Sequence, residues 1–318
     1  MSGRHILALS GGVGGAKLAA GLAQVTAPKD LTLVVNTGDD FEHLGLTICP
    51  DIDSVVYAIA GLNDTQRGWG VENETWQAMT MLRALGEEAW FNLGDRDLGM
   101  HIARSWRLRA GETLSQVTAK LTRELGIAHA VHPMSDDAVR TQVMTLAGWT
   151  DFQRWFVGDQ CVATVSDVRF DGAADARSSP GLAKALDRDD LAAIVICPSN
   201  PFLSVDPILS LAGVGGALTA RQVPVIAVSP IVGGTSVKGP LAKMLTDWGQ
   251  IVSNEAIARH YRDHWGDLLD HLLIDEADEA DVPGLQARGL KVTVTKTMMR
   301  DAADRERLAK EVLAIAGI

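Results

Sequence analysis

Four aspartates lie within fifteen positions of one another, at the ends of apolar segments. Asp39 and Asp40 close the segment NTGDD, and Asp51 and Asp53 belong to the segment CPDID. Carboxylates are costly to crowd at the ends of buried elements unless a cation lies among them. Mg²⁺ takes one or two carboxylates together with water and phosphate oxygens, so we expect its ligands among Asp39, Asp40 and Asp51. The alternative for a single aspartate is that it caps a helix.

A glycine-rich turn, SGGVGGAKL at residues 10–18, leads into an alanine-rich helix that we expect to continue to about residue 25. Glycine lets the backbone approach a ligand closely, and the free amides at a helix start can receive a phosphate. The turn is not a Walker A loop, because Ala16 precedes Lys17 and no Ser or Thr follows. We predict a diphosphate site, with a tight turn that binds nothing as the alternative. Its candidate contacts are Gly11, Gly12, Gly14, Gly15 and Lys17.

Three further segments carry polar or aromatic side chains. Ser199 and Asn200 stand between prolines in CPSNP, and a rigid loop of this kind can read a base or a sugar hydroxyl. A plain turn is the alternative for this loop. Arg96 and His101 are candidates to face a phosphate or a ring, although a structural role for the histidine is as frequent. Trp69 offers a flat apolar surface to an aromatic ligand, and core packing is its more common use.

Apolar runs rich in β-branched residues predict the strands that position these segments. They lie at residues 5–9, 31–35, 191–196, 223–228 and 272–274. Strands that are apolar on both faces and alternate with helical stretches indicate a parallel sheet covered on both sides. We therefore expect a Rossmann-like, doubly wound α/β fold with a mainly parallel sheet. Its ligand crevice should lie at the carboxyl ends of the strands, where the motifs above begin.

The pattern changes to helical periodicity over residues 65–149, with expected helices at residues 74–85, 100–108 and 114–125. We interpret this range as a mainly helical insertion that caps the carboxyl edge of the sheet and forms part of the active site. Residues 1–64 and 150–318 then make the Rossmann-like core. Residues 167–190 are expected to form a polar connection and a short helix.

The composition excludes several classes of protein. A net charge of -11 over 318 residues opposes a general nucleic-acid binder, which needs a basic surface. No apolar run approaches the roughly 20 residues that cross a bilayer, and no secretion signal is evident at the start. Three cysteines without paired spacing suit reduced thiols. We expect a cytoplasmic protein with neither a nucleic-acid nor a membrane partner.

Eight motifs, taken in order, resemble those of the 2-phospho-L-lactate transferase family. They are LSGGVGGAKL (9–18), NTGDD (36–40), PDID (50–53), GWG (68–70), LGDRD (93–97), PMSDD (133–137), FQ (152–153) and PSNP (198–201). The resemblance runs from residue 6 to about residue 275. It implies a Rossmann-like core, a homodimer, Mg²⁺ and a role in coenzyme F420 biosynthesis.

The resemblance also implies the reaction. A guanosine diphosphate conjugate donates a phospho-acyl group to the ribityl hydroxyl of 7,8-didemethyl-8-hydroxy-5-deazariboflavin, and GMP is released. In the family, the aspartate that closes Pro-Asp-x-Asp contacts the deazaflavin, which carries over to Asp53. The position before Leu-Gly-Asp-Arg-Asp also contacts it, and here that residue is Asn92, where other members can have a basic residue.

The implied chemistry is attack by a primary alcohol on the phosphorus distal to guanosine, which depends on positioning and charge neutralisation. Asp53 is the candidate to orient the hydroxyl or to accept its proton, and Asp51 is the second candidate catalytic residue. The donor acid stays open among phospholactyl, phosphoenolpyruvyl and phosphoglyceryl. One alternative is a non-catalytic, nucleotide-sugar-binding regulator of the same superfamily. A weaker alternative is an NAD-type dehydrogenase, which the missing third glycine of its fingerprint opposes.

Overall fold

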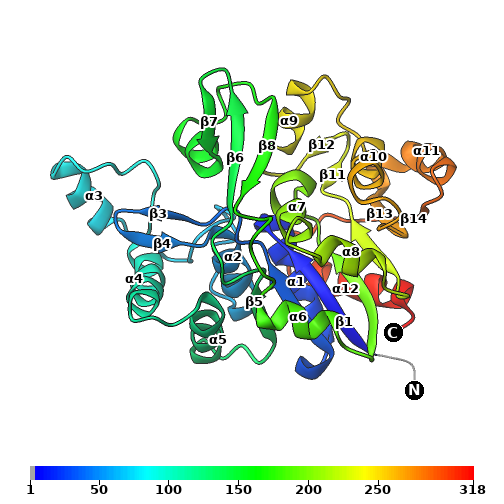
Figure 1. Ribbon diagram of the computed structural model, residues 1–318, viewed down its shortest axis with the longest axis horizontal. Coiled ribbons are helices and arrows are strands. Elements are labelled where there is room, and N and C mark those ends of the chain that lie inside the picture. The colour runs from blue at the N-terminus through cyan, green and yellow to red at the C-terminus, as the bar shows by residue number, and fades with distance from the viewer. Residues whose placement is uncertain (1–3) are drawn as a thin grey trace.

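The computed structural model describes residues 4–318 and has a seven-stranded sheet at its centre (Figure 1). In spatial order the strands are β14 (Lys291–Thr295), β13 (His271–Asp275), β10 (Val225–Val228), β9 (Leu191–Ile196), β1 (His5–Ser10), β2 (Leu31–Val35) and β5 (Ala130–Pro133). Every neighbouring pair is parallel. The five strands expected from the sequence are confirmed, and β5 and β14 are additional. All carboxyl ends therefore open on one edge of the sheet.

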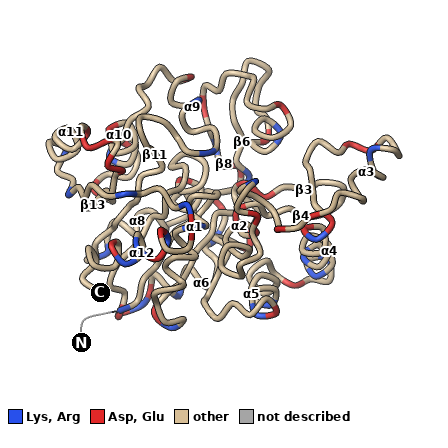
Figure 2. Tube along the Cα trace, turned by 180° about the vertical axis from the view of Figure 1, so that it is seen from behind, with Lys and Arg blue, Asp and Glu red and all other residues tan. Residues whose placement is uncertain are grey.

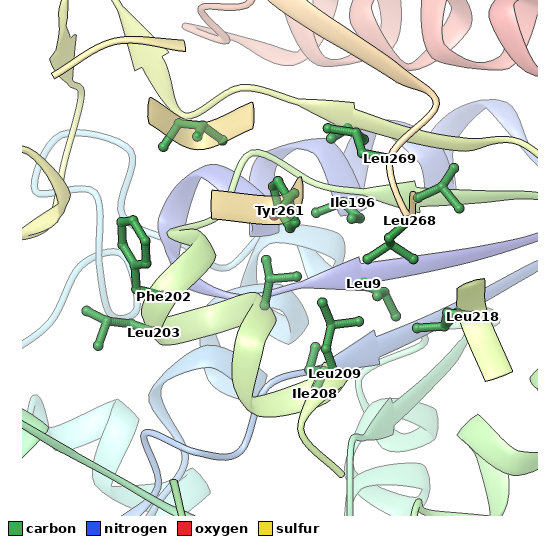
Figure 3. Close-up of a cluster of buried hydrophobic side chains, with 14 of the residues drawn as sticks. Leu9, Ile196, Phe202, Leu203, Ile208, Leu209, Leu218, Tyr261, Leu268 and Leu269 are labelled. Atoms are coloured by element: carbon green, nitrogen blue, oxygen red, sulfur yellow. The ribbon is translucent and has the colours of Figure 1, made fainter. Parts of the chain in front are cut away.

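Helices cover both faces of this sheet, because each central strand is apolar on both sides. In β1, Ile6 and Ala8 pack into one core cluster, whereas Leu7 and Leu9 pack into the other. The first cluster is covered by α1 (Gly12–Val25), α2 (Pro50–Ala60) and α12 (Ala302–Ala316). The second is covered mainly by α6 (Pro180–Leu186), α7 (Asp206–Leu209), α8 (Val214–Thr219), α9 (Leu241–Asp247), α10 (Asn254–Trp265) and α11 (Val282–Ala287). Figure 3 shows part of the second cluster, and the doubly wound α/β fold is confirmed.

An arm projects from one side of this core (left in Figure 1). It contains the hairpin β3 (Phe41–His43) and β4 (Leu46–Ile48), together with α3 (Gln77–Ala84) and α4 (Asp95–Arg109). Ile48, Met79 and Leu93 form its small core. Helix α5 (Leu114–Glu124) follows and begins with a capping box in which Thr113 and Gln116 bond each other's backbone amides. The arm is therefore held to the core by α2, α4 and the hairpin.

The expected insertion at residues 65–149 contains these three helices, but its last part belongs elsewhere. Strand β5 pairs with β2 at the edge of the central sheet. Strand β6 (Arg140–Thr145) forms a separate antiparallel sheet with β7 (Gly148–Asp151) and β8 (Asp167–Asp171). The stretch expected to be a polar connection thus contains β8 before the short helix α6.

The remaining elements are short. They are the pair β11 (Ile231–Val232) and β12 (Thr235–Ser236), the 3-10 turns η1 (Pro28–Asp30) and η4 (Glu276–Asp281), and the π-helical turns η2 (Arg154–Gly158) and η3 (Pro201–Val205). Across residues 4–318, none of the helices combines the length and the apolar character that a membrane span requires.

Candidate active site at the carboxyl edge of the sheet

The glycine-rich turn joins three segments that are distant in the sequence. Gly11, the N-cap residue of α1, donates its amide to Ser199 Oγ at 3.1 Å. Gly12 donates its amide to Asp51 Oδ1 at 2.7 Å. The ends of β1 and β9 and the start of α2 therefore meet at one point. This is the edge at which an α/β sheet of this type binds ligands.

Packing within the protein explains three of the four glycines in this turn. A Cβ at Gly11 or Gly15 would lie within 2.6 Å of neighbouring side-chain atoms, and one at Gly14 would collide with the Pro198 carbonyl. Gly12 differs, since its φ is +65° and a Cβ there would meet no atom within 4 Å. Only Gly12 faces open space at the start of α1. It is therefore the glycine whose surroundings best fit close approach of a ligand.

Several buried oxygens of the acidic segments have no hydrogen-bond partner among the residues that the structure describes. Asn36 fixes Asp51 by donating from Nδ2 to its Oδ2 at 2.9 Å. Within the described residues, Oδ1 of Asp39, Oδ1 of Asp40 and Oγ1 of Thr141 are buried and have no hydrogen-bond partner. Burying a carboxylate without partners is strongly unfavourable. These orphaned oxygens fit a cation, which is what the sequence predicts at this place.

The raised pKa values of Asp39, Asp40 and Asp51 also fit a cation at this place. Burial raises the pKa of Asp40 to about 7 and that of Asp51 to about 6. Burial and the nearby Asp51 raise the pKa of Asp39 well above its usual range. A divalent cation reverses such shifts by stabilising the ionised carboxylates. Figure 2 shows acidic positions gathered around α2, next to the start of α1.

A second cluster, formed by Asp53, Asp97 and His101, has the spacing that is expected of metal ligands. In the part of the chain that the structure describes, it is the only trio whose ligand atoms all lie within 4.8 Å of one another. However, Arg104 donates to both oxygens of Asp53, with Nη1 at 3.1 Å from Oδ2. Burial lowers the pKa of Arg104, but Asp53 and other nearby groups raise it further, so that it lies above its usual range. Asp53 is thus neutralised by a protein cation, which makes this cluster an ion-pair network.

The residues around Asp53 were largely missed by the sequence reasoning. Only His101 was singled out as a candidate to face a ligand; Asp97 was interpreted as a turn or cap residue of LGDRD, and Tyr57 and Arg104 were not named. The available signal was spacing: residues 97, 101 and 104 fall on one face of a helix, as residues 53 and 57 do on α2.

Several other predicted contacts are occupied by the protein itself. Lys17 donates from Nζ to the Met299 carbonyl at 2.7 Å, and burial lowers its pKa, as do Lys238 and Arg305. Asn200 accepts from the Phe202 amide at 3.0 Å, so it caps the turn that follows it. Asn92 accepts from Arg83 at 2.8 Å, and no hydrogen bond among residues 4–318 joins it to the aspartates. Arg96 bonds the Glu72 carbonyl.

A groove beside the glycine turn has the aromatic wall that the sequence suggested. Val13, Lys17, Tyr57 and Trp69 help to line it, between α1, α2 and the loop that follows α2. Trp69 is 45% exposed, and the Arg67 guanidinium lies 5.4 Å from its ring centroid. An exposed indole face next to cations suits a planar ligand.

Comparisons with known proteins agree with one another over almost the whole chain. The family model described as 2-phospho-L-lactate transferase CofD matches residues 6–314. A phosphoenolpyruvate transferase of Kitasatospora aureofaciens is 36% identical over 318 aligned residues, covering 98% of both chains. A 2-phospho-L-lactate transferase of Methanosarcina acetivorans is 36% identical over 310, with the same coverage. A solved structure from Bacillus halodurans, of a UPF0052 family protein, superposes with a TM-score of 0.66 at 16% identity, covering 98% of this chain and 99% of that one. This last likeness shows the fold alone.

Proposed function

Because the chain belongs to the 2-phospho-L-lactate transferase family, we propose that it transfers a phospho-acyl group to a deazaflavin alcohol in coenzyme F420 biosynthesis. The donor is a guanosine diphosphate conjugate, the acceptor is the ribityl hydroxyl of 7,8-didemethyl-8-hydroxy-5-deazariboflavin, and GMP leaves. Relatives named as transferases along the full length do not favour a non-catalytic regulator.

One observation carries the proposal: orphaned carboxylate oxygens lie beside a helix start that is open at Gly12. The carboxylates need a cation, and the first-turn amides of a helix attract phosphate. A diphosphate with Mg²⁺ satisfies both needs at once. Asp39, Asp40 and Asp51 are the predicted ligands; because their oxygens do not all lie within 4.8 Å of one another in the part of the chain that the structure describes, at most two of them would hold one ion directly, together with water and phosphate oxygens. The ion would supply neutralisation of the charge that develops on the leaving phosphate.

The chain's own residues then divide the work of positioning. The start of α1 binds the diphosphate, and Ser199 fixes the turn by accepting from Gly11. Arg104 uses one lone pair of each Asp53 oxygen, which leaves lone pairs with which Asp53 can accept from the acceptor hydroxyl. Asp53 therefore acts by orienting the hydroxyl. The exposed face of Trp69 beside this groove is our candidate contact for a planar ring.

The test is to incubate the purified protein and Mg²⁺ with the deazaflavin alcohol and each of the phospholactyl, phosphoenolpyruvyl and phosphoglyceryl donors. Mass spectrometry identifies the products. We expect the phospho-acylated deazaflavin and GMP with at least one donor, and none from Asp51→Asn. Asp190→Asn is the matched control, because Asp190 is an exposed aspartate just before β9, at the opposite edge of the sheet. The absence of product with all three donors would overturn the proposal.

The homodimer and the cytoplasmic location are proposals that rest on the resemblance and the sequence. Ile102 and Trp106, which are 55% and 64% exposed and lie one turn apart on α4, support self-association. Light scattering of the purified chain measures the oligomeric state.

A further inference from the structure

A buried polar network joins α2 to α4 beside the candidate active site. It consists of Asp53 and Tyr57 on α2 and of Asp97, His101 and Arg104 on α4. All five side chains are less than a tenth exposed. Their spacing, four residues on α2 and four then three on α4, stacks them on the facing sides of the two helices. We call this set the α2–α4 network.

The contacts within the α2–α4 network run in one order. Tyr57 donates its hydroxyl to Asp97 Oδ1 at 2.6 Å, and His101 Nε2 lies 3.3 Å from the same oxygen. On the other side of the ring, Arg104 Nη1 lies 3.3 Å from His101 Nδ1. The same guanidinium donates hydrogen bonds to both carboxylate oxygens of Asp53. The chain of contacts therefore leads from Tyr57 through the imidazole to the carboxylate that faces the acceptor.

The partners of the imidazole determine how its two nitrogens act. A guanidinium has only donors, so Nδ1 must accept from Arg104. Nε2 then carries the proton; it lies 3.3 Å from Asp97 Oδ1 but, among the described residues, has no partner in hydrogen-bond geometry. The hydrogen bond at one ring nitrogen decides whether the other nitrogen donates or accepts. A neighbouring carboxylate has this effect on many metal-binding histidines. Asp53 Oδ2 is more distant from Nδ1, at 3.6 Å.

Packing alone does not hold the Arg104 guanidinium against Asp53. A small cavity adjoins the pair, and the Thr118 hydroxyl in its wall is buried without a hydrogen-bond partner among residues 4–318. The other lining residues from outside the network, Ile52, Val56, Met100 and Leu121, are apolar. The contact with His101 adds to those with Asp53 and the Thr47 carbonyl in setting the plane of the guanidinium.

We propose that His101 is a positioning residue of the transfer reaction: Asp97 orients its ring, its Nδ1 orients Arg104, and Arg104 presents Asp53 to the acceptor hydroxyl. This inference rests on the proposed function. It assigns no bond-making step to His101, which does not touch the reacting atoms.

Two amide variants separate this role from simple packing. In His101→Asn the amide oxygen can take the place of Nδ1 and accept from Arg104. In His101→Gln the amide group reaches the place of Nε2, which leaves Arg104 without its acceptor. We expect His101→Asn to keep turnover close to wild type. We expect His101→Gln to lower kcat about 10-fold to 100-fold, since a misplaced group costs up to that much, while the donor KM stays unchanged. Equal losses in the two folded variants, or a larger loss in His101→Asn, would overturn the proposal.

A second measurement does not depend on activity. The ¹⁵N shifts of histidine rings in the labelled wild-type protein report which nitrogen carries the proton, and the signal that is missing in a His101 variant assigns the residue. We expect the Nε2–H form for His101 near neutral pH and its loss in Asp97→Asn. An Nδ1–H ring would overturn the network even if both amide variants failed to fold. A wild-type protein inactive with every donor but showing the Nε2–H form would refute the proposed function and leave the network standing.

Discussion

Replacing Asp53 by Asn should destabilise the fold strongly, although the two side chains have nearly the same size. Among the residues that the structure describes, Asp53 has the only carboxylate that bonds Arg104, a residue that is 1% exposed, and the change removes it. An uncompensated buried charge costs about 3–5 kcal/mol when one partner of a buried pair is lost. At about 2 °C per kcal/mol for a chain of this size, the melting temperature should fall by roughly 6–10 °C.

Removing both charges tests whether the cost comes from the orphaned guanidinium. Arg104→Met alone leaves Asp53 buried without its partner and should be similarly destabilising. The double variant Asp53→Asn with Arg104→Met should recover most of the loss, because replacing both members of a buried pair is often close to neutral. The expected coupling free energy is about 2–3 kcal/mol. Recovery should be incomplete, since Arg104 also donates to the Thr47 carbonyl at 3.3 Å.

Urea denaturation followed by circular dichroism gives the four free energies of unfolding, in chelator so that no metal contributes. Asp190→Asn is the control: it breaks the exposed pair with Arg188 and should change the free energy by less than about 1 kcal/mol. The reasoning fails if Asp53→Asn stays within about 1 kcal/mol of wild type, which is well below the cost of a broken buried pair. It also fails if the two single effects simply add.

Two further predictions concern the other half of the site. Gly14→Ala should lose more stability in urea than Gly12→Ala, because the new Cβ at position 14 meets the Pro198 carbonyl. Gly12→Ala adds only left-handed backbone strain of about 1–2 kcal/mol and should mainly weaken donor binding. Equal unfolding curves for the two variants would contradict this. The pKa values of Asp40 and Asp51 are raised to about 7 and about 6 in the folded state. Between about pH 4 and pH 7 the folded protein therefore holds protons that the unfolded chain has released, so the metal-free stability should fall as the pH rises through this range. Mg²⁺ replaces those protons, so its stabilising effect in thermal unfolding should be larger at pH 8 than at pH 6, and an equal effect at both would count against a metal at these aspartates.

The sequence predicted the parts of the fold that are buried on both faces. The strands beside β1 are continuous apolar runs, which only a covered parallel sheet explains. The two edge strands escaped this criterion. Strand β14 is partly exposed along its length, and β5 is four residues long and ends in proline. An edge strand needs no continuous apolar run, so its pattern does not stand out from a loop.

At the site, the local motifs were predictable and the contacts between distant segments were not. The glycine turn and the aspartates are close in sequence and follow strand ends, which fixes their place in an α/β fold. Ser199 was found, but its contact with the amide of Gly11 needs the register of β1 beside β9. Arg104 lies 51 residues from Asp53 along the chain, and nothing local indicates that pairing.

Helix α4 shows why such a pairing resists prediction. Its buried side carries Asp97, His101, Arg104 and Ser105, whereas Ile102 and Trp106 are exposed. An amphipathic helix is normally oriented with its apolar stripe inward, and this rule predicts that the wrong side of α4 is buried. Burying the five polar side chains of the α2–α4 network stabilises the fold less than apolar contacts of the same size would, unless each of these side chains has its hydrogen-bond partner. A helix that departs from the local rule beside an active site is therefore best explained by what its polar face does there, which is to fix the direction of Asp53.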